Sequence, residues 1–267
     1  MPGMMNLGIE LQNEKTAFFE EDQVVIVGLA SHSGIKRLHA GRNGVFIKLK
    51  NVVKNYKTPA GDFQALKGIN AAFHKSEFIG VIGKSGAGKS TLVNMLTGVD
   101  HLTSGEVWVD GVAVHGLNED QMALWRGKNV GVVYQSFELM PTMTLLDNIL
   151  LPMDFCGLYQ PRASVERAMH LLDLVELADQ AQKVPSAVSG GQRQRAAIAR
   201  ALANDPTLIV ADEPTGNLDS VTAETVFKVF ETLIHEGKTI VMVTHDESLS
   251  RRFDDVLKIA DGQIVED

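Results

Sequence analysis

The sequence feature that most constrains this chain is a glycine-rich octapeptide that follows an apolar run. Residues 83–90 read Gly-Lys-Ser-Gly-Ala-Gly-Lys-Ser and fit the phosphate-loop pattern G-x-x-x-x-G-K-[ST]. A loop whose backbone N–H groups surround phosphate oxygens has little room for side chains, which explains the glycines. The helix predicted after it offers the positive end of its dipole to the same phosphates. A chance match is the alternative, and the strand-loop-helix context argues against it.

The loop residues have specific predicted roles in binding a nucleotide. Lys89 is expected to reach the β- and γ-phosphates, and the Ser90 hydroxyl is expected to bind Mg²⁺. Their neighbours supply backbone N–H groups and space around the phosphates. The predicted nucleotide-binding residues of this segment are Gly83, Lys84, Ser85, Gly86, Ala87, Gly88, Lys89, Ser90 and Thr91.

A second candidate site follows the apolar run Leu208–Ala211, which ends in Asp212 and Glu213. The carboxyl ends of parallel strands form the edge of a sheet at which ligands bind. Asp212 is therefore predicted to hold the Mg²⁺ shell, and Glu213 to polarise the water that attacks the γ-phosphate. A strand that simply runs out into solvent is the alternative, which the phosphate loop in the same chain makes the weaker one.

A third segment, Ser189, Gly190, Gly191 and Gln192, precedes the alanine-rich run Arg193–Ala203. A serine and two glycines at the start of a helix predict a second anion-binding site. A serine-capped helix without a ligand is the alternative. One nucleotide cannot be wrapped by two distant phosphate sites. The segment therefore predicts a site that is completed by another copy of the chain.

Together these segments resemble the nucleotide-binding domain of ABC transporters over residues 45–267. That family pairs a phosphate loop with an LSGGQ signature motif, and here Val188 stands at the first signature position, where it keeps an apolar contact. The resemblance adds four site residues. It implies that Tyr56 stacks on adenine, that Gln135 contacts Mg²⁺ and couples to a membrane partner, that Asp219 crosses the dimer interface, and that His245 contacts the γ-phosphate. The implied catalytic residues are Glu213, His245 and Gln135.

The predicted fold class is α/β. The resemblance implies a P-loop NTPase with a mostly parallel sheet core, an N-terminal antiparallel β portion and a helical insert that carries the signature motif. Strand-like runs alternate with helical patterns, as a parallel sheet requires; they lie at 45–53, 78–82, 130–134, 208–211 and 239–243. The helical insert is expected at about 137–187, with helical patterns at 163–174 and 174–182. Residues 1–44 are interpreted as an N-terminal extension of unknown role that holds one strand-like run, Val24–Leu29.

Composition and charge exclude several other classes of protein. The formal net charge of −8 argues against a nucleic-acid binder, so Arg193, Arg195 and Arg200 are interpreted as a solvated and interface face of the signature helix. The single cysteine, Cys156, allows no intrachain disulfide and suits a reducing cytosol. The sequence holds neither an apolar run of roughly 18 residues nor the pattern of a signal peptide. We therefore expect no membrane span in this chain.

The resemblance implies an ATPase that uses ATP and Mg²⁺ in a head-to-tail homodimer to drive an integral membrane permease from the cytoplasmic face of the plasma membrane. Residues 211–219 (ADEPTGNLD) resemble the ATPases of lipoprotein release, macrolide export and cell-division complexes. A soluble ABC ATPase that serves no transporter, such as a cluster-assembly ATPase, remains the alternative.

The segment Ser136–Leu158 is predicted to contact the membrane partner. It is rich in large apolar residues, and Pro141 and Pro152 are expected to interrupt a continuous helix. Methionines such as Met140 and Met143 suit an adaptable apolar groove for a partner helix. We therefore expect a short cytoplasmic helix of the partner to dock there.

Overall fold

The chain divides into two compact units, Met1–Gly41 and Arg42–Asp267. The computed structural model describes residues 19–20, 23–24, 44–59 and 61–265. In the first unit these include one antiparallel pair, β1 (Phe19–Glu20) and β2 (Gln23–Val24). Most of the strand-like run expected at Val24–Leu29 lies outside the described residues.

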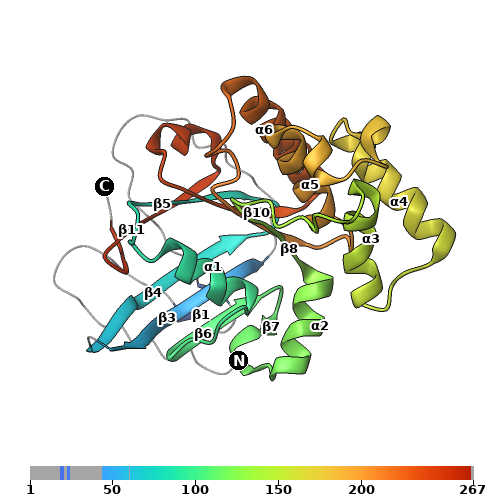
Figure 1. Cartoon of the computed structure of the whole chain (residues 1–267). Coiled ribbons are helices and arrows are strands. Elements are labelled where there is room, and N and C mark those ends of the chain that lie inside the picture. The colour runs from blue at the N-terminus through green and yellow to red at the C-terminus, as the bar shows by residue number, and fades with distance from the viewer. Residues whose placement is uncertain (1–18, 21–22, 25–43, 60, 266–267) are drawn as a thin grey trace, which may run out of the picture. The chain divides into compact units, whose positions relative to one another are not determined.

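The second unit is built on a six-stranded sheet in the order β12-β11-β5-β10-β9-β8, whose centre is visible in Figure 1. Neighbouring strands from β11 to β8 run parallel, and β12 closes one edge antiparallel to β11. The strands are β5 (Phe78–Ile82), β8 (Val130–Val133), β9 (Leu208–Asp212), β10 (Thr239–Thr244), β11 (Asp255–Ala260) and β12 (Gln263–Ile264). β5 and β10 are buried along their whole length, as expected of parallel strands that are covered on both faces.

A four-stranded antiparallel sheet in the order β4-β3-β6-β7 lies on one side of the first sheet. Its strands are β3 (Val45–Thr58), β4 (Gly61–His74), β6 (Ser104–Val109) and β7 (Val112–Ala113). Helix α1 (Lys89–Thr97) contacts β4 and β6 of this sheet and β9 and β10 of the other, so it lies between them. The short helix η1 (Val114–Gly116) and the helix α2 (Glu119–Asn129) follow.

Alternation along the parallel strands divides the interior of this unit into two apolar cores. In β10, Val241 and Val243 face the core that contains α1, whereas Ile240 and Met242 face the other core. Helices cover that second face, as Figure 1 shows. They are α3 (Leu145–Phe155), α4 (Pro161–Leu174), η2 (Ala178–Gln180), η3 (Pro185–Ala187), α5 (Gly190–Ala201), α6 (Ser220–His235) and η4 (Glu247–Arg252). The predicted fold class is confirmed: the second unit is an α/β P-loop NTPase with an antiparallel β portion and a helical insert.

The structure corrects two details of the predicted insert. Pro152 does not interrupt the structure, because it lies in the last turn of α3, where its missing N–H removes only one helical hydrogen bond. The helix expected at 174–182 is absent. Helix α4 ends at Leu174, and Glu176 adopts a left-handed conformation with φ of 58°. The N–H of Leu177 donates to the Leu172 carbonyl, which closes the helix end in the way a C-terminal cap does.

Candidate nucleotide-binding site

The phosphate loop connects the end of β5 to the start of α1. Gly88 is the N-cap of α1 with φ of 106°, and no side chain caps the helix, so its first N–H groups face a potential ligand. A Cβ atom on Gly88 would lie 2.7 Å from the carbonyl oxygen of Ala65, so only glycine fits. The Lys89 ammonium donates to the carbonyl oxygens of Gly83 at 2.7 Å and Lys84 at 3.0 Å. The lysine is thus held over the loop.

The acidic end of β9 lies beside the start of α1. The Ser90 hydroxyl donates to Asp212 Oδ2 over 3.3 Å. Burial raises the pKa of Asp212, and the nearby charge of Glu213 adds to the rise, against the opposing effects of Ser90 and Lys89. Glu213 has φ of 47°, and its Oε1 lies 2.7 Å from His245 Nδ1. A carboxylate is therefore oriented by a histidine at the end of the next strand.

A cavity of about 790 Å³ opens where these segments meet. Its lining residues are Phe63, Ala65, Lys84, Ser85, Gly86, Gly88, Lys89, Ser90, Thr91, Gln135, Asp212, Glu213 and His245. Most of the predicted site residues thus come together from β5, α1, β8, β9 and β10. Gly83 and Ala87 lie behind the lining instead: a Cβ on Gly83 would meet the Ile259 carbonyl oxygen at 2.2 Å, and Ala87 is buried.

Family comparison agrees with this geometry. The family model described as "ABC transporter" matches residues 66–216, more than half of the chain. The chain belongs to the ABC transporter family. It is an ABC transporter ATP-binding subunit and an ATPase. Its relatives include proteins named as ABC transporter ATP-binding proteins, LolD and MacB, which supports the transporter assignment and not the soluble alternative.

Three relatives of this ABC ATPase illustrate the match. An uncharacterised ABC transporter ATP-binding protein of Methanocaldococcus jannaschii, MJ0796, is 41% identical over 82% of this chain and 94% of its own length. The lipoprotein-releasing system ATP-binding protein LolD 1 of Chlorobium chlorochromatii is 40% identical over 83% of this chain and 91% of its own. The macrolide export ATP-binding/permease protein MacB of Rhodopirellula baltica is 40% identical over 83% of this chain, which spans 33% of that longer protein.

Solved structures of ABC cassettes share the fold. A dimeric structure of a post-hydrolysis state of the ATP-binding cassette MJ0796, bound to ADP and Pi, superposes with a TM-score of 0.77 at 39% identity. The match covers 82% of this chain and 97% of that one.

An aromatic residue of the cavity lining that the sequence analysis did not identify is Phe63. It lines the cavity, and its side chain is 53% exposed. Phe63 pairs directly with Tyr56 across β3 and β4, so the two side chains lie on the same face of the sheet. The sequence signal for Phe63 was the alternation of apolar and polar residues in the strand after Gly61. This alternation points to the nucleotide-binding face only when the register of β4 with β3 is known.

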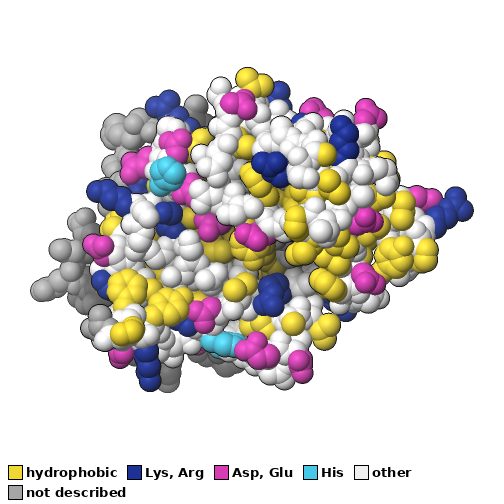
Figure 2. Space-filling model, in the orientation of Figure 1, with side chains coloured by type: hydrophobic (Ala, Val, Ile, Leu, Met, Phe, Trp, Pro, Cys, Tyr) yellow, Lys and Arg dark blue, Asp and Glu magenta, His cyan; other side chains and the backbone are white. Residues whose placement is uncertain are grey.

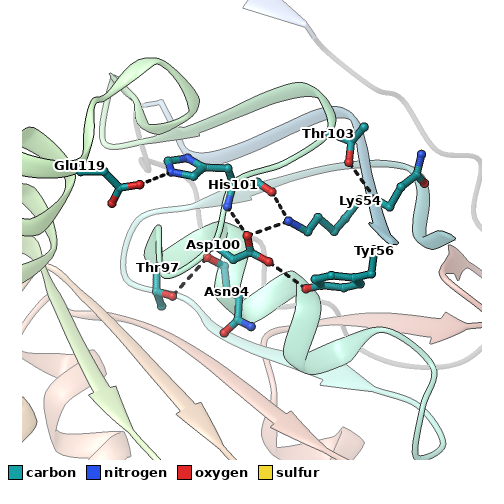
Figure 3. Close-up of polar contacts among 9 residues, drawn as sticks. Lys54, Tyr56, Asn94, Thr97, Asp100, His101, Thr103 and Glu119 are labelled. Carbon is teal, nitrogen blue, oxygen red and sulfur yellow. Dashed lines mark hydrogen bonds and ion pairs between the residues drawn. The ribbon is translucent and has the colours of Figure 1, made fainter. Parts of the chain in front are cut away.

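Tyr56 itself does not line the cavity of this ABC ATPase. Its phenol hydroxyl donates to Asp100 Oδ2 over 3.0 Å, as Figure 3 shows. The side chain of Thr91, which lines the cavity, acts on the same phenol and opposes the rise in the pKa of Tyr56 that its burial causes. Tyr56 therefore lies next to the cavity wall.

The signature and dimer-loop residues of the ABC ATPase lie together, away from the cavity lining. Ser189 is the N-cap of α5, and its side chain accepts a hydrogen bond from the Gln192 N–H in a complete capping box. Asp219 is the N-cap of α6 and accepts from the Thr222 hydroxyl at 2.7 Å. A Cβ on Gly191 would lie 2.5 Å from Thr222 Cγ2, so the starts of α5 and α6 are packed closely.

The sequence analysis predicted that the three arginines of the signature helix form a solvated and interface face. The solvated part of this prediction is wrong, because all three side chains are partly buried and donate to backbone carbonyls. Arg193 donates to the Val188 carbonyl at 2.9 Å, and Arg195 to the Val175 carbonyl at 2.7 Å. The Arg200 guanidinium donates to the carbonyls of two residues in left-handed conformation, Phe137 and Glu138. The sequence could not show this, because the acceptors are backbone oxygens brought close only by the fold.

Proposed function

We propose that two copies of this ABC ATPase pair head to tail around two ATP molecules. The observation that carries the proposal is the division of the site residues into two groups. The phosphate loop, Gln135, Asp212, Glu213 and His245 surround one cavity. The signature residues and Asp219 meet at Thr222 and do not line that cavity. A second copy would bring its signature helix to the ATP of the first, and the dimeric structures of MJ0796 support this arrangement.

The residues at the Asp212 edge of the cavity fit a magnesium ion. Mg²⁺ takes hard oxygen ligands and keeps several waters and phosphate oxygens in its shell. Ser90 Oγ and Asp212 Oδ2 lie 3.3 Å apart, and Gln135 lines the same cavity. Among the described residues no group of three His, Cys, Asp or Glu side chains forms a metal site. When bound, the ion would neutralise charge on the phosphates.

The proposed hydrolysis step uses Glu213 as the base. A water oxygen attacks the γ-phosphorus, the bond to the β–γ bridging oxygen breaks, and the water proton passes to the Glu213 carboxylate. An ionised carboxylate only accepts hydrogen bonds, so in the pair with Glu213 the proton lies on His245 Nδ1. This contact orients the base. The His245 side chain is 66% exposed and has room to contact the γ-phosphate.

We also propose that the dimer drives an integral membrane permease from the cytoplasmic face of the plasma membrane. No helix in the described part of the chain has the length and apolar character to cross a bilayer. The role would be export, lipoprotein release or mechanotransmission, and the names of the relatives MacB and LolD 1 support the first two.

The permease would dock in an apolar hollow between α2, α3 and α5. This hollow has a volume of about 630 Å³, and Figure 2 shows hydrophobic side chains gathered over the region of α3. Leu124, Met140 and Phe155 line it and are 56%, 45% and 78% exposed. Met143 lines a separate hollow of about 220 Å³. Arg200 lies in the larger hollow and holds the backbone that joins Gln135 to Met140, which would connect the docking site to the ATP site.

The dimer is tested with variants that separate ATP binding from pairing. Glu213→Gln should bind ATP normally, lose about 100-fold or more in turnover, and accumulate as a dimer with ATP and Mg²⁺ in size-exclusion chromatography. Adding Ser189→Asp keeps a good N-cap but places a negative charge against the partner's γ-phosphate. This double variant should bind ATP with unchanged affinity and remain monomeric.

Ser189→Asn in the same background is the matched control. It is also a good N-cap, carries no charge, and should dimerise more readily than the aspartate variant. Dimers that form equally well with aspartate, or full ATPase activity in Glu213→Gln, would contradict the proposal.

A further inference from the structure

The Tyr56 hydroxyl belongs to a compact polar cluster around Asp100, which follows the C-terminal end of α1 (Figure 3). The Asp100 carboxylate is its centre. It accepts hydrogen bonds from the Tyr56 hydroxyl at 3.0 Å, the Lys54 ammonium at 2.7 Å and the His101 N–H at 2.7 Å. Neither Asp100 nor Lys54 belongs to the motifs by which the sequence resembles ABC ATPases.

The Lys54 ammonium makes its hydrogen bonds within this cluster. It is 8% exposed, and its ammonium also donates to the His101 carbonyl at 2.6 Å. The same nitrogen lies 4.8 Å from the centre of the Tyr56 ring. A nearly buried ammonium is costly unless it is paired, so Asp100 and Lys54 stabilise each other beside the ring.

The ionisation states of the cluster suit a fixed hydrogen bond from Tyr56. Burial alone would raise the pKa of Asp100, but hydrogen bonds from Lys54, Tyr56 and His101 outweigh it and lower this pKa below its ordinary value. Burial and the hydrogen bond to Asp100 raise the pKa of Tyr56. At neutral pH the phenol is therefore the donor and the carboxylate the acceptor.

The position of Asp100 is set by the same helix that begins at the phosphate loop. Helix α1 ends at its C-cap, Gly98, with φ of 64°. The N–H groups of Val99 and Asp100 both point to the Asn94 carbonyl, at 3.0 and 3.4 Å. The helix thus carries Lys89 and Ser90 at one end and leads directly to Asp100 at the other.

We propose that Asp100 and Lys54 are positioning residues for ATP binding, which hold the Tyr56 ring at a fixed distance from the phosphate loop for contact with the nucleobase. This inference rests on the proposed contact of Tyr56 with adenine. Phe63, on the same sheet face and lining the cavity, would form the other part of the apolar base-binding surface. The carboxylate acts through the tyrosine and does not itself touch the nucleotide.

The test separates base binding from phosphate binding. In Asp100→Asn, the affinity for MgATP measured by isothermal titration calorimetry should fall about five- to tenfold. The asparagine can replace the charge-assisted hydrogen bond from Tyr56 only by a neutral one, a loss of about one ordinary net hydrogen bond. The affinity for inorganic tripolyphosphate with Mg²⁺, which has no base, should not change. Tyr56→Phe should weaken ATP in the same selective way. Adding Asp100→Asn to Tyr56→Phe should weaken it little further, because both changes remove the same contact.

Glu106→Gln is the matched control. Glu106 also accepts from a β3 lysine, Lys50, at 2.9 Å and from an aromatic N–H, that of Trp108, at 3.0 Å, but it does not line the ATP site. Its variant should bind both ligands as the unmodified protein does. Equal loss of ATP and tripolyphosphate affinity in Asp100→Asn would show a general disturbance of α1 and overturn the inference.

Tyr56→Ala distinguishes the proposed adenine contact of Tyr56 from the positioning role of Asp100. If Tyr56→Ala leaves ATP affinity unchanged, the proposed adenine contact itself is wrong. If Tyr56→Ala weakens ATP but Asp100→Asn and Tyr56→Phe do not, the adenine contact stands and the positioning role of Asp100 is wrong.

Discussion

The starts of α1 and α5 are both glycine-rich helix N-termini, yet they differ in what satisfies their first N–H groups. At α1 the N-cap is Gly88, with no side-chain hydrogen bond. At α5 the N-cap is Ser189, which together with Gln192 forms a complete capping box. The α1 terminus therefore depends on a ligand for its hydrogen bonds, whereas α5 is already capped by its own residues.

The difference indicates a division of labour. The uncapped terminus lies in a cavity that also holds two lysines, two carboxylates and a histidine, so we expect one chain to bind ATP by itself. The capped terminus needs no ligand to complete its hydrogen bonds, and its partly exposed glycines, Gly190 and Gly191, would meet the ATP of a second copy. Changes at α1 should therefore affect ATP binding to the monomer, and changes at α5 should affect only pairing.

The largest effect is expected from a change at the start of α1. Lys89→Ala removes the cation nearest the β- and γ-phosphates, and a hydrogen bond to a charged group contributes about 1.5–3 kcal/mol, so ATP affinity should fall at least about tenfold. Turnover should be lost as well. Lys48→Ala, at an exposed position of β3, changes the net charge equally and should bind ATP normally. Unchanged ATP affinity in Lys89→Ala, by calorimetry, would contradict the assigned role.

A second prediction concerns a variant that leaves the starts of α1 and α5 unchanged and should prevent only the binding of the permease. Met140→Glu places a charge in the apolar hollow, so complex formation and transport should be lost while the isolated subunit still binds ATP. Val265→Glu is the matched control, because Val265 is 43% exposed against 45% for Met140 and does not line the hollow. Co-purification with the permease measures the effect. If Met140→Glu assembles at normal affinity, the docking surface lies elsewhere.

The smallest effect is expected for removal of residues 1–41, the first compact unit. Every residue predicted for the ATP site lies in the second unit, Arg42–Asp267. ATP affinity and ATPase rate should remain within about twofold of the full chain, as measured on the purified truncated protein. A truncated protein that folds, by circular dichroism, but cannot bind ATP would show a role for this unit in the site.

The sequence predicted those parts of the site that depend on local chemistry. Glycines at 83, 86 and 88 and the Lys89-Ser90 pair require a phosphate loop wherever a buried strand precedes them. The apolar run of β9 places Asp212 and Glu213 at a strand end without reference to the rest of the chain. The predicted strands at 78–82 and 239–243 are also confirmed, because continuous apolar runs of that length form buried parallel strands.

Tertiary structure alone decided the contacts that join distant segments. The sequence shows neither that Asp100 holds Tyr56 nor that Phe63 lines the cavity, since both depend on the register of β3 with β4 and on the end of α1. It gave the wrong environment for Arg200, whose acceptors are carbonyls of a loop more than 60 residues away. Local motifs fix which backbone groups and charges are present, but partners far apart in the chain are set by packing, which no single segment encodes.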